Sequence, residues 1–276
     1  MNRSLALACM AFMLLAILFT PSLAHAVAIN ITIPDGLTSN GNPWYKNTNE
    51  DQEVEPGNET GQKWDLEAFF QDGSILTIVG GFDFKDGVKV SKYLTFESGD
   101  IFIDVTGDAI YGADNTATST GWTTVANTYG YDYVYDVDFE TGTYTLYALT
   151  DASTVTVYYS ENSESNPYRY ASGGTVVTTG VLVFTELNNN DPLASDFEGK
   201  THYALSVSLD GLPQGVDYVA HYTIGCGNDN LMGEGQTPEL AGPQDANPVP
   251  EPQTIALLLS GIVAFGVRKR LKKALY

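Results

Sequence analysis

Between its two ends the chain alternates apolar and polar residues instead of repeating apolar ones every three or four positions. Short runs rich in Val, Ile, Thr, Tyr and Phe are separated by Gly, Asn and Asp. A two-residue period is typical of strands with one buried face. The pattern predicts strands at Ala28–Ile33, Ile75–Val79, Tyr93–Phe96, Ile101–Val105, Tyr131–Phe139, Thr143–Leu149, Thr154–Tyr159, Thr175–Phe184, His202–Leu209 and Tyr218–Ile224.

Residues 131–139 show this alternation most clearly, with Tyr, Val and Phe on one predicted face and mostly Asp on the other. Turn signals follow at 140–142, and others stand at 85–87 and 210–211. About ten short strands without crossover helices predict an all-β fold. We expect an antiparallel two-sheet β-sandwich of jelly-roll or lectin-like type, followed by one C-terminal apolar helix.

The first 26 residues carry the features of a secretory signal peptide. Arg3 supplies a positive start, residues 5–19 are apolar, and a Thr-Pro-Ser sequence ends that run. Ala24 and Ala26 place small residues where signal peptidase cleaves. We therefore expect export through the Sec translocon, cleavage by signal peptidase after Ala26, and a mature chain that starts at Val27. An uncleaved N-terminal membrane anchor is the alternative.

A second apolar segment, residues 254–267, lies near the C-terminus and is followed by the basic sequence RKRLKK. At about 1.5 Å per residue it would span roughly 21 Å, less than a ~30 Å hydrocarbon core. Its terminal position and the basic cluster still favour a transmembrane helix, because such clusters stay on the cytoplasmic side.

Pro250, Glu251 and Pro252 stand just before this segment. A Pro-Glu-Pro motif, a short apolar helix and a basic tail, in that order, resemble the PEP-CTERM sorting signal of Gram-negative bacteria. The resemblance covers residues 249–273. It implies that an exosortase recognises the precursor and cuts it near the motif, and that the mature form reaches the cell surface or is secreted, associated with extracellular polysaccharide. An ordinary tail anchor on a Pro-rich stalk is the alternative.

These features divide the chain into a signal peptide (1–26), a β-sandwich ectodomain (27–232), a stalk rich in Pro, Gly and acidic residues (233–249), and a sorting signal (250–273). The whole chain has a net charge of −21. Residues 27–253 hold only seven Lys and Arg against all 34 Asp and Glu, which gives −27. Such a surface repels phosphate backbones, so we expect no nucleic-acid partner.

Ca²⁺ is the candidate cofactor, because it binds carboxylate and carbonyl oxygens in Asp- and Asn-rich loops. None of the acidic groups fits an EF-hand loop. The alternative is that these residues solvate strand faces and turns. The preferred group is Asp132, Asp136 and Asp138; the other two are Asp100, Asp104 and Asp108, and residues 188–191 with Asp196 and Glu198.

Near the end of the ectodomain, a segment resembles a His-x-Thr-x-x-Cys-Gly-Asn-Asp stretch found before the stalk of many PEP-CTERM proteins. Its residues are His221, Thr223, Cys226, Gly227, Asn228 and Asp229. Chemically, the His and Cys could belong to a metal or nucleophile site. We favour a structural role, with a half-buried His and a buried thiol. Cys226 is the only Cys left after signal removal, so no internal disulfide can form.

Enzyme motifs such as G-x-S-x-G, H-E-x-x-H and the P-loop are absent from the sequence. Trp44, Trp64 and Trp122 could each stack on a sugar ring, although large aromatics more often lie in the core. We therefore expect a non-enzymatic, exported protein of the cell envelope or extracellular polysaccharide matrix. The alternatives are a carbohydrate-binding module, with or without Ca²⁺ dependence, and a secreted polysaccharide hydrolase.

Overall fold

The computed structural model describes residues 28–33, 50–52, 54, 59–110, 121–158 and 165–239. The predicted signal peptide with Ala24 and Ala26, the Pro250–Pro252 motif and the apolar helix at 254–267 lie outside these residues. Within the described ranges, no helix is long and apolar enough to cross a membrane. A short 3-10 turn, η1 (Gln62–Trp64), precedes the first long strand.

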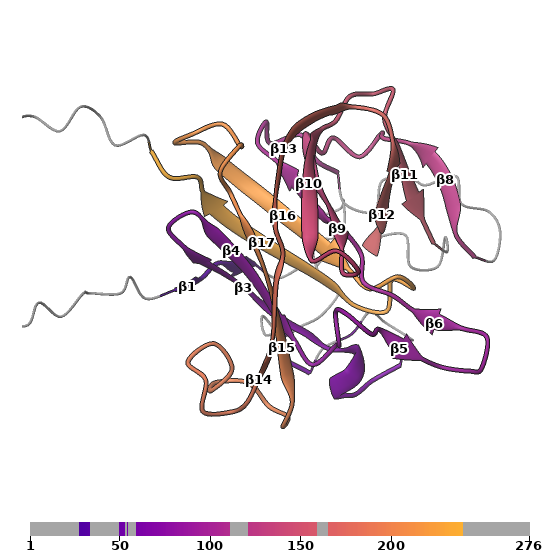
Figure 1. The fold of residues 1–276 in the computed structure, drawn as a ribbon, viewed down its shortest axis with the longest axis vertical. Coiled ribbons are helices and arrows are strands. Elements are labelled where there is room, and N and C mark those ends of the chain that lie inside the picture. The colour runs from indigo at the N-terminus through magenta and orange to yellow at the C-terminus, as the bar shows by residue number, and fades with distance from the viewer. Residues whose placement is uncertain are drawn as a thin grey trace, which may run out of the picture. The chain divides into compact units, whose positions relative to one another are not determined.

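Two antiparallel sheets form most of the described domain (Figure 1). The five-stranded sheet contains, in spatial order, β1 (Ile29–Asn30), β3 (Leu66–Asp72), β4 (Ile75–Gly80), β15 (His202–Ser208) and β14 (Val183–Leu187). The seven-stranded sheet contains β13 (Thr175–Val181), β10 (Thr143–Ala148), β9 (Tyr133–Asp138), β7 (Ile101–Asp104), β16 (Asp217–Thr223), β17 (Asn230–Gln236) and β2 (Thr32–Ile33).

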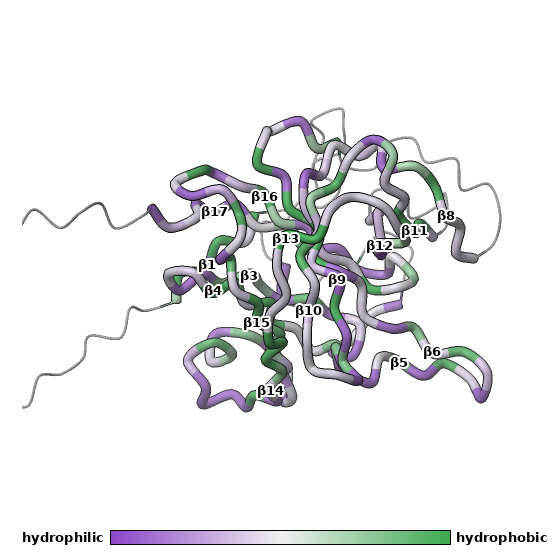
Figure 2. The backbone as a smooth tube through the Cα atoms, turned by 45° about the horizontal axis from the view of Figure 1, so that its top comes forward, coloured by the Kyte–Doolittle hydropathy of each residue, from purple (hydrophilic) through white to green (hydrophobic). Residues whose placement is uncertain are grey.

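Both sheets contribute to one hydrophobic core. Phe69 and Ile78 come from the five-stranded sheet, Tyr135 and Tyr222 come from the seven-stranded sheet, and all are fully buried in one cluster. The Tyr135 hydroxyl donates a hydrogen bond of 2.9 Å to the Ser208 carbonyl, which satisfies this polar group inside the core. Figure 2 shows hydrophobic residues where β15 runs through the centre and hydrophilic ones along the loop after β14.

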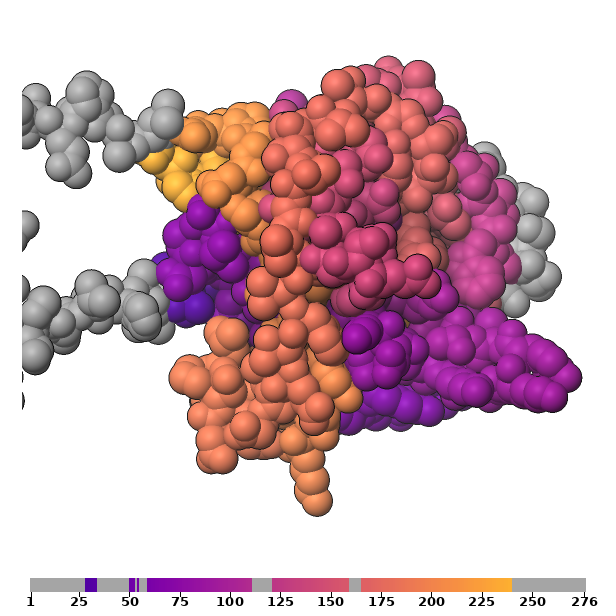
Figure 3. Space-filling view, in the orientation of Figure 1, coloured from indigo at the N-terminus to yellow at the C-terminus, as the bar shows by residue number. Residues whose placement is uncertain are grey.

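A smaller sheet and a hairpin complete the described domain. The three-stranded sheet contains β12 (Arg169–Ser172), β11 (Thr154–Val157) and β8 (Thr123–Ala126). The hairpin pairs β5 (Val88–Lys89) with β6 (Thr95–Phe96) and projects from the body on the right of Figure 3. The strands predicted at 93–96 and 154–159 contain β6 and β11, whereas β5, β8 and β12 were not predicted, because these strands are too short to give a clear alternation.

The three-stranded sheet explains why one face of β9 is less polar than expected. Val134 was predicted on the solvated face with the Asp residues, but it is fully buried. It packs with Phe102, Val155 and Val157 in a second hydrophobic cluster. The seven-stranded sheet is therefore covered on both faces here. The prediction had assumed one buried and one exposed face, because residues 131–139 alternate with a period of two.

The prediction of an all-β fold with antiparallel sheets is confirmed for the described residues. The 140–142 turn is also confirmed: Gly142 has a positive φ of 67° and links β9 to β10. The expected strand at 175–184 instead breaks at Leu182, so that β13 and β14 lie in different sheets.

The predicted ectodomain boundary at residue 232 is wrong, because it falls inside β17. That strand continues to Gln236, and the buried Thr237 hydroxyl donates to the Pro213 carbonyl at 2.7 Å. Residues 233–236 were predicted to belong to the stalk because they are rich in Gly. Gly233 is required by packing: a Cβ there would lie 2.9 Å from the Cβ of Phe69 on β3.

Candidate functional site

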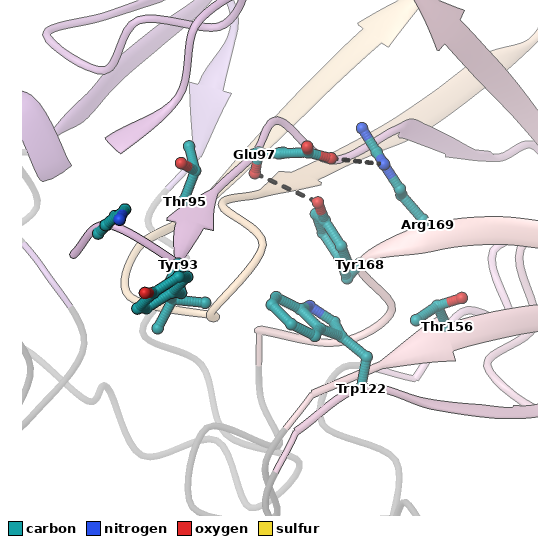
Figure 4. A pocket seen from close by; sticks show the side chains of 9 residues that line it. Tyr93, Thr95, Glu97, Trp122, Thr156, Tyr168 and Arg169 are labelled. Carbon is teal, nitrogen blue, oxygen red and sulfur yellow. Dashed lines mark hydrogen bonds and ion pairs between the residues drawn. The ribbon is translucent and has the colours of Figure 1, made fainter. Parts of the chain in front are cut away.

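An open pocket of about 620 Å³ lies between the β5–β6 hairpin and the three-stranded sheet (Figure 4). The hairpin provides one wall, and residues beside or within β8, β11 and β12 provide the other. Its lining residues are Lys92, Tyr93, Leu94, Thr95, Glu97, Trp122, Thr156, Tyr168 and Arg169. They combine aromatic rings, cationic groups and a carboxylate around one concave surface.

Two exposed aromatic rings stand on the two sides of this pocket (Figure 4). Tyr93, in the turn of the hairpin, is 89% exposed, and Trp122 is 44% exposed. Trp122 is held in place because its indole N–H donates to the Gly225 carbonyl at 2.7 Å. Its ring also lies 5.3 Å from that of Tyr158 and 6.1 Å from that of Phe96. Trp122 is thus a fixed ring with an accessible part.

The polar wall of the pocket is built around Glu97. Arg169 Nη1 lies 3.1 Å from Glu97 Oε2, and the Tyr168 hydroxyl donates to the Glu97 backbone carbonyl at 3.3 Å (Figure 4). The Arg169 guanidinium also lies over the Tyr168 ring, 5.3 Å from its centroid. Burial raises the pKa of the Tyr168 hydroxyl, so this group stays protonated at neutral pH.

The segment from His221 to Asp229 contacts this wall through Gly225. Gly225 accepts the Trp122 indole N–H, and its own N–H donates to the Glu97 carbonyl at 3.0 Å. A Cβ at Gly225 would come within 2.7 Å of the Tyr168 ring. The close approach of three segments at Gly225 therefore fixes both Trp122 and Tyr168, which is a structural contribution to the pocket.

The other residues of this segment also hold the structure together. The Thr223 hydroxyl donates to the Asp229 carbonyl, and Gly227 has a φ of 64° in the turn. The Asn228 side chain makes two hydrogen bonds with the backbone of Glu59, and Asp229 Oδ2 accepts the Leu66 N–H at 2.6 Å. These contacts tie the β16–β17 turn to the start of β3.

His221 and Cys226 have different surroundings. His221 is fully buried, not half-buried as expected, and its ring stacks on Tyr131 with centroids 5.5 Å apart. Burial lowers the pKa of its imidazole to about 3. Cys226 carries a buried thiol whose pKa is raised by burial to about 12, the opposite of an activated nucleophile.

The structure does not bring the three predicted metal ligands together. Asp132 accepts the Val105 N–H at 2.8 Å, Asp136 is partly buried in β9, and Asp138 is exposed and accepts N–H groups of the following turn. Among the described residues, three other acidic side chains have oxygens within 4.8 Å of one another. Asp132, Asp136 and Asp138 do not form such a cluster, and Ca²⁺ binding at these residues stays a prediction.

That other set is Asp51, Asp65 and Glu67, which could hold a cation only with Glu67 deprotonated. Both oxygens of Asp65 accept hydrogen bonds from Gln52. Burial, with the neighbouring charge of Asp65, raises the pKa of Glu67 to about 9, and Glu67 contacts His202 Nδ1 at 2.7 Å. No sequence pattern pointed to this set, because Asp51 precedes β3 and approaches it only in the fold.

The other two acidic groups serve turns and strands. Asp100 is buried and accepts the N–H groups of Val137 and Tyr170, while burial raises its pKa to about 7. Asp104 caps the residues after β7. In the loop after β14, Asn188 and Asp191 accept N–H groups within their own turns. Asn188 and Asp191 thus follow the alternative interpretation given above, whereas Asp100 and Asp104 are buried and satisfied by backbone N–H groups.

A second, smaller hollow of about 310 Å³ is lined by three carboxylates, Asp108, Asp132 and Asp151, together with Tyr131 and other residues. The Thr106 hydroxyl lies 2.7 Å from Asp108 and 3.1 Å from Asp132, so it bridges these two. Tyr131 is buried against His221 and offers no exposed ring face. This hollow lacks the exposed aromatic surface of the first pocket.

Sequence reasoning identified Trp122 as a candidate but missed most of its neighbours. Trp64 is 3% exposed and belongs to the core, and Trp44 lies outside the described residues. Tyr93 was assigned to a strand, whereas it lies in the turn before β6. Residues 27–253 contain few Lys and Arg, and two of these, Lys92 and Arg169, line the pocket. The positions of these rare cations are the sequence signal that could have indicated it.

No family model, curated protein or solved structure matches this chain. Its function is therefore inferred from the chemistry of its own residues.

Proposed function

We propose that this is an exported, surface-sorted protein of the cell envelope or extracellular polysaccharide matrix, and that its β-domain binds polysaccharide without cleaving it. Signal peptidase would release the N-terminus after Ala26, and an exosortase would act near Pro250–Pro252. The pocket containing Tyr93 and Trp122 carries the binding proposal, because exposed aromatic faces stack on the C–H groups of sugar rings.

The position of the pocket supports this role. In Figure 1, β1 and the C-terminal end of β17 lie on the left, whereas the β5–β6 hairpin and β8 lie on the right. The chain continues toward the proposed sorting signal from the end of β17. The pocket and the end of β17 thus lie on different sides of the described domain, so the chain that leaves β17 does not cover the pocket. We accordingly favour a lectin-like β-sandwich as the detailed fold.

Hydrolysis is the less favoured function. Glycosidases use two carboxyl groups roughly 5–10 Å apart, one of which acts as an acid. Among the residues that line the aromatic pocket, Glu97 supplies the carboxylate. Its Oε2 lies 3.1 Å from Arg169 Nη1. This arrangement suits orientation of a bound sugar better than general acid catalysis.

A glycan array probed with the full chain in mild detergent, with and without Ca²⁺, tests the proposal. We expect binding to polysaccharides, and we expect Tyr93→Ala and Trp122→Ala to weaken it while the chain stays folded by circular dichroism. Val181→Ala, a substitution at a 73% exposed position on β13, is the control. Equal binding by all four proteins would reject this pocket, and release of shortened sugars would favour the hydrolase.

A further inference from the structure

The cations of this acidic domain are not distributed evenly. Residues 27–253 contain seven Lys and Arg, and six of them are among the described residues. Lys92 and Arg169 line the aromatic pocket, and Lys89 is exposed on β5 of the same hairpin. The other described cations are Lys63, Lys85 and Lys200. Half of the described positive side chains therefore lie in or beside one pocket.

The two lining cations approach the pocket from opposite walls. Lys92 is exposed, and its Nζ lies 5.4 Å from the centroid of the Tyr93 ring. Arg169 comes from β12, and its side chain is 33% exposed. Arg169 donates from Nη1 to Glu97. A guanidinium has five N–H donors in a planar fork, so this one bond orients the group and leaves donors for a ligand.

A neutral sugar would not require this arrangement. Stacking on Tyr93 and Trp122 needs only aromatic surface, and neutral hydroxyl groups are recognised by uncharged side chains as well as by charged ones. Two cations beside such rings match a sugar that carries a carboxylate, because a planar guanidinium can bind a carboxylate with two parallel hydrogen bonds. The net charge of −27 opposes an anionic ligand from a distance, but salt screens that effect beyond about 8 Å at physiological ionic strength.

We propose that the pocket is selective for acidic polysaccharide: a uronate residue stacks on Tyr93 or Trp122 while its carboxylate binds Arg169 and Lys92. This inference rests on the proposed function and adds the chemical class of the ligand. Glu97 holds the guanidinium in place for the incoming carboxylate. The remaining lining groups, such as Thr95 and Thr156, provide hydroxyls for the neutral parts of the sugar.

The test measures binding of the full chain in mild detergent to polygalacturonate and to a neutral glucan of similar length. We expect tighter binding to polygalacturonate, weakened by raising the salt from 0.05 to 0.3 M. Arg169→Gln and Lys92→Gln should each lower affinity for the acidic polymer by about tenfold. Lys200→Gln removes the same charge outside the pocket and should change the affinity little.

Each outcome separates the inference from the proposed function. Equal affinity for both polymers would overturn the acidic selectivity but leave polysaccharide binding intact. Preference for the acidic polymer that survives both pocket substitutions would place recognition elsewhere and also overturn the inference. Binding to neither polymer would reject both. Lys92 is exposed in the turn between β5 and β6, so Lys92→Gln tests the inference even if Arg169→Gln lowers stability.

Discussion

Glu67 and His202 meet with both side chains fully buried. Burial raises the pKa of the carboxyl group to about 9 and lowers the pKa of the imidazole. Both shifts favour the neutral forms, so we expect a hydrogen bond between a carboxylic acid and a neutral imidazole at pH 7. Such a buried group couples the stability of the domain to pH.

We predict that Glu67→Gln reduces the loss of stability at alkaline pH. The native carboxyl group keeps its proton up to pH of about 9, whereas the unfolded one loses it near 4.5, so the native state binds more protons between these values. The free energy of unfolding therefore falls as pH rises through this range. Urea unfolding at pH 5, 7 and 9 should show a flatter profile for Glu67→Gln.

The matched control is Glu186→Gln, at an exposed position on β14. It should follow the pH profile of the unmodified chain. If Glu67→Gln retained the same slope between pH 5 and 9, the assignment of a protonated carboxyl group to Glu67 would be wrong.

At the level of elements, hydrogen bonds from the β16–β17 turn decide how the two main sheets are joined. Asp229 follows β16 in the seven-stranded sheet, and its Oδ2 accepts the N–H of Leu66, the first residue of β3 in the five-stranded sheet. Both residues are buried. The turn thus connects two strands from different sheets through one carboxylate.

We predict that Asp229→Ala destabilises the domain by about 1–3 kcal/mol, because it leaves the buried Leu66 N–H without its acceptor. Asp229→Asn keeps an oxygen at this position and should cost less. Denaturant midpoints measure both effects. Asp196→Ala, at an exposed loop position, is the control; a loss for Asp229→Ala no larger than for this control would contradict a structural role for the turn.

At the level of the whole molecule, the acidic charge of −27 on residues 27–253 makes divalent cations stabilising. We predict that millimolar Ca²⁺ raises the melting temperature more than Mg²⁺ does in 0.15 M salt, because Mg²⁺ loses its hydration water reluctantly. Changing Asp132, Asp136 and Asp138 to Asn should not abolish the difference, since their oxygens do not converge. Equal shifts with both ions would reduce the effect to general screening of charge.

The second prediction at this level concerns sorting. Replacing Pro250, Glu251 and Pro252 with Ala should leave membrane insertion intact, because the apolar segment at 254–267 supplies that free energy. It should block maturation at the cell surface if the motif is what the exosortase recognises. Cell fractionation and surface labelling measure the two steps. Surface display equal to that of the unmodified chain would reject the sorting assignment.

The alternation of apolar and polar residues determined the all-β class and the approximate positions of most longer strands. This works because burying one face of a strand requires a two-residue period, which is a local property of the sequence. The same logic failed at Val134, where a third sheet covers the second face, and at β17, whose glycines allow close packing on Phe69. The burial of Val134 and the packing of β17 both depend on which segments of the chain contact one another. The alternation of apolar and polar residues does not contain that information.

The sequence by itself also determined the charge, the scarcity of cations and the order of features at both ends. Only the tertiary structure decided which side chains share a site. It separates Asp132, Asp136 and Asp138, although they are close along the chain, and joins Asp51 to Glu67. It likewise brings Tyr93, Trp122 and Arg169 from three distant segments into one pocket. The physical reason is that contacts between sheets are set by packing and hydrogen bonds at points such as Gly225, which local sequence patterns do not encode.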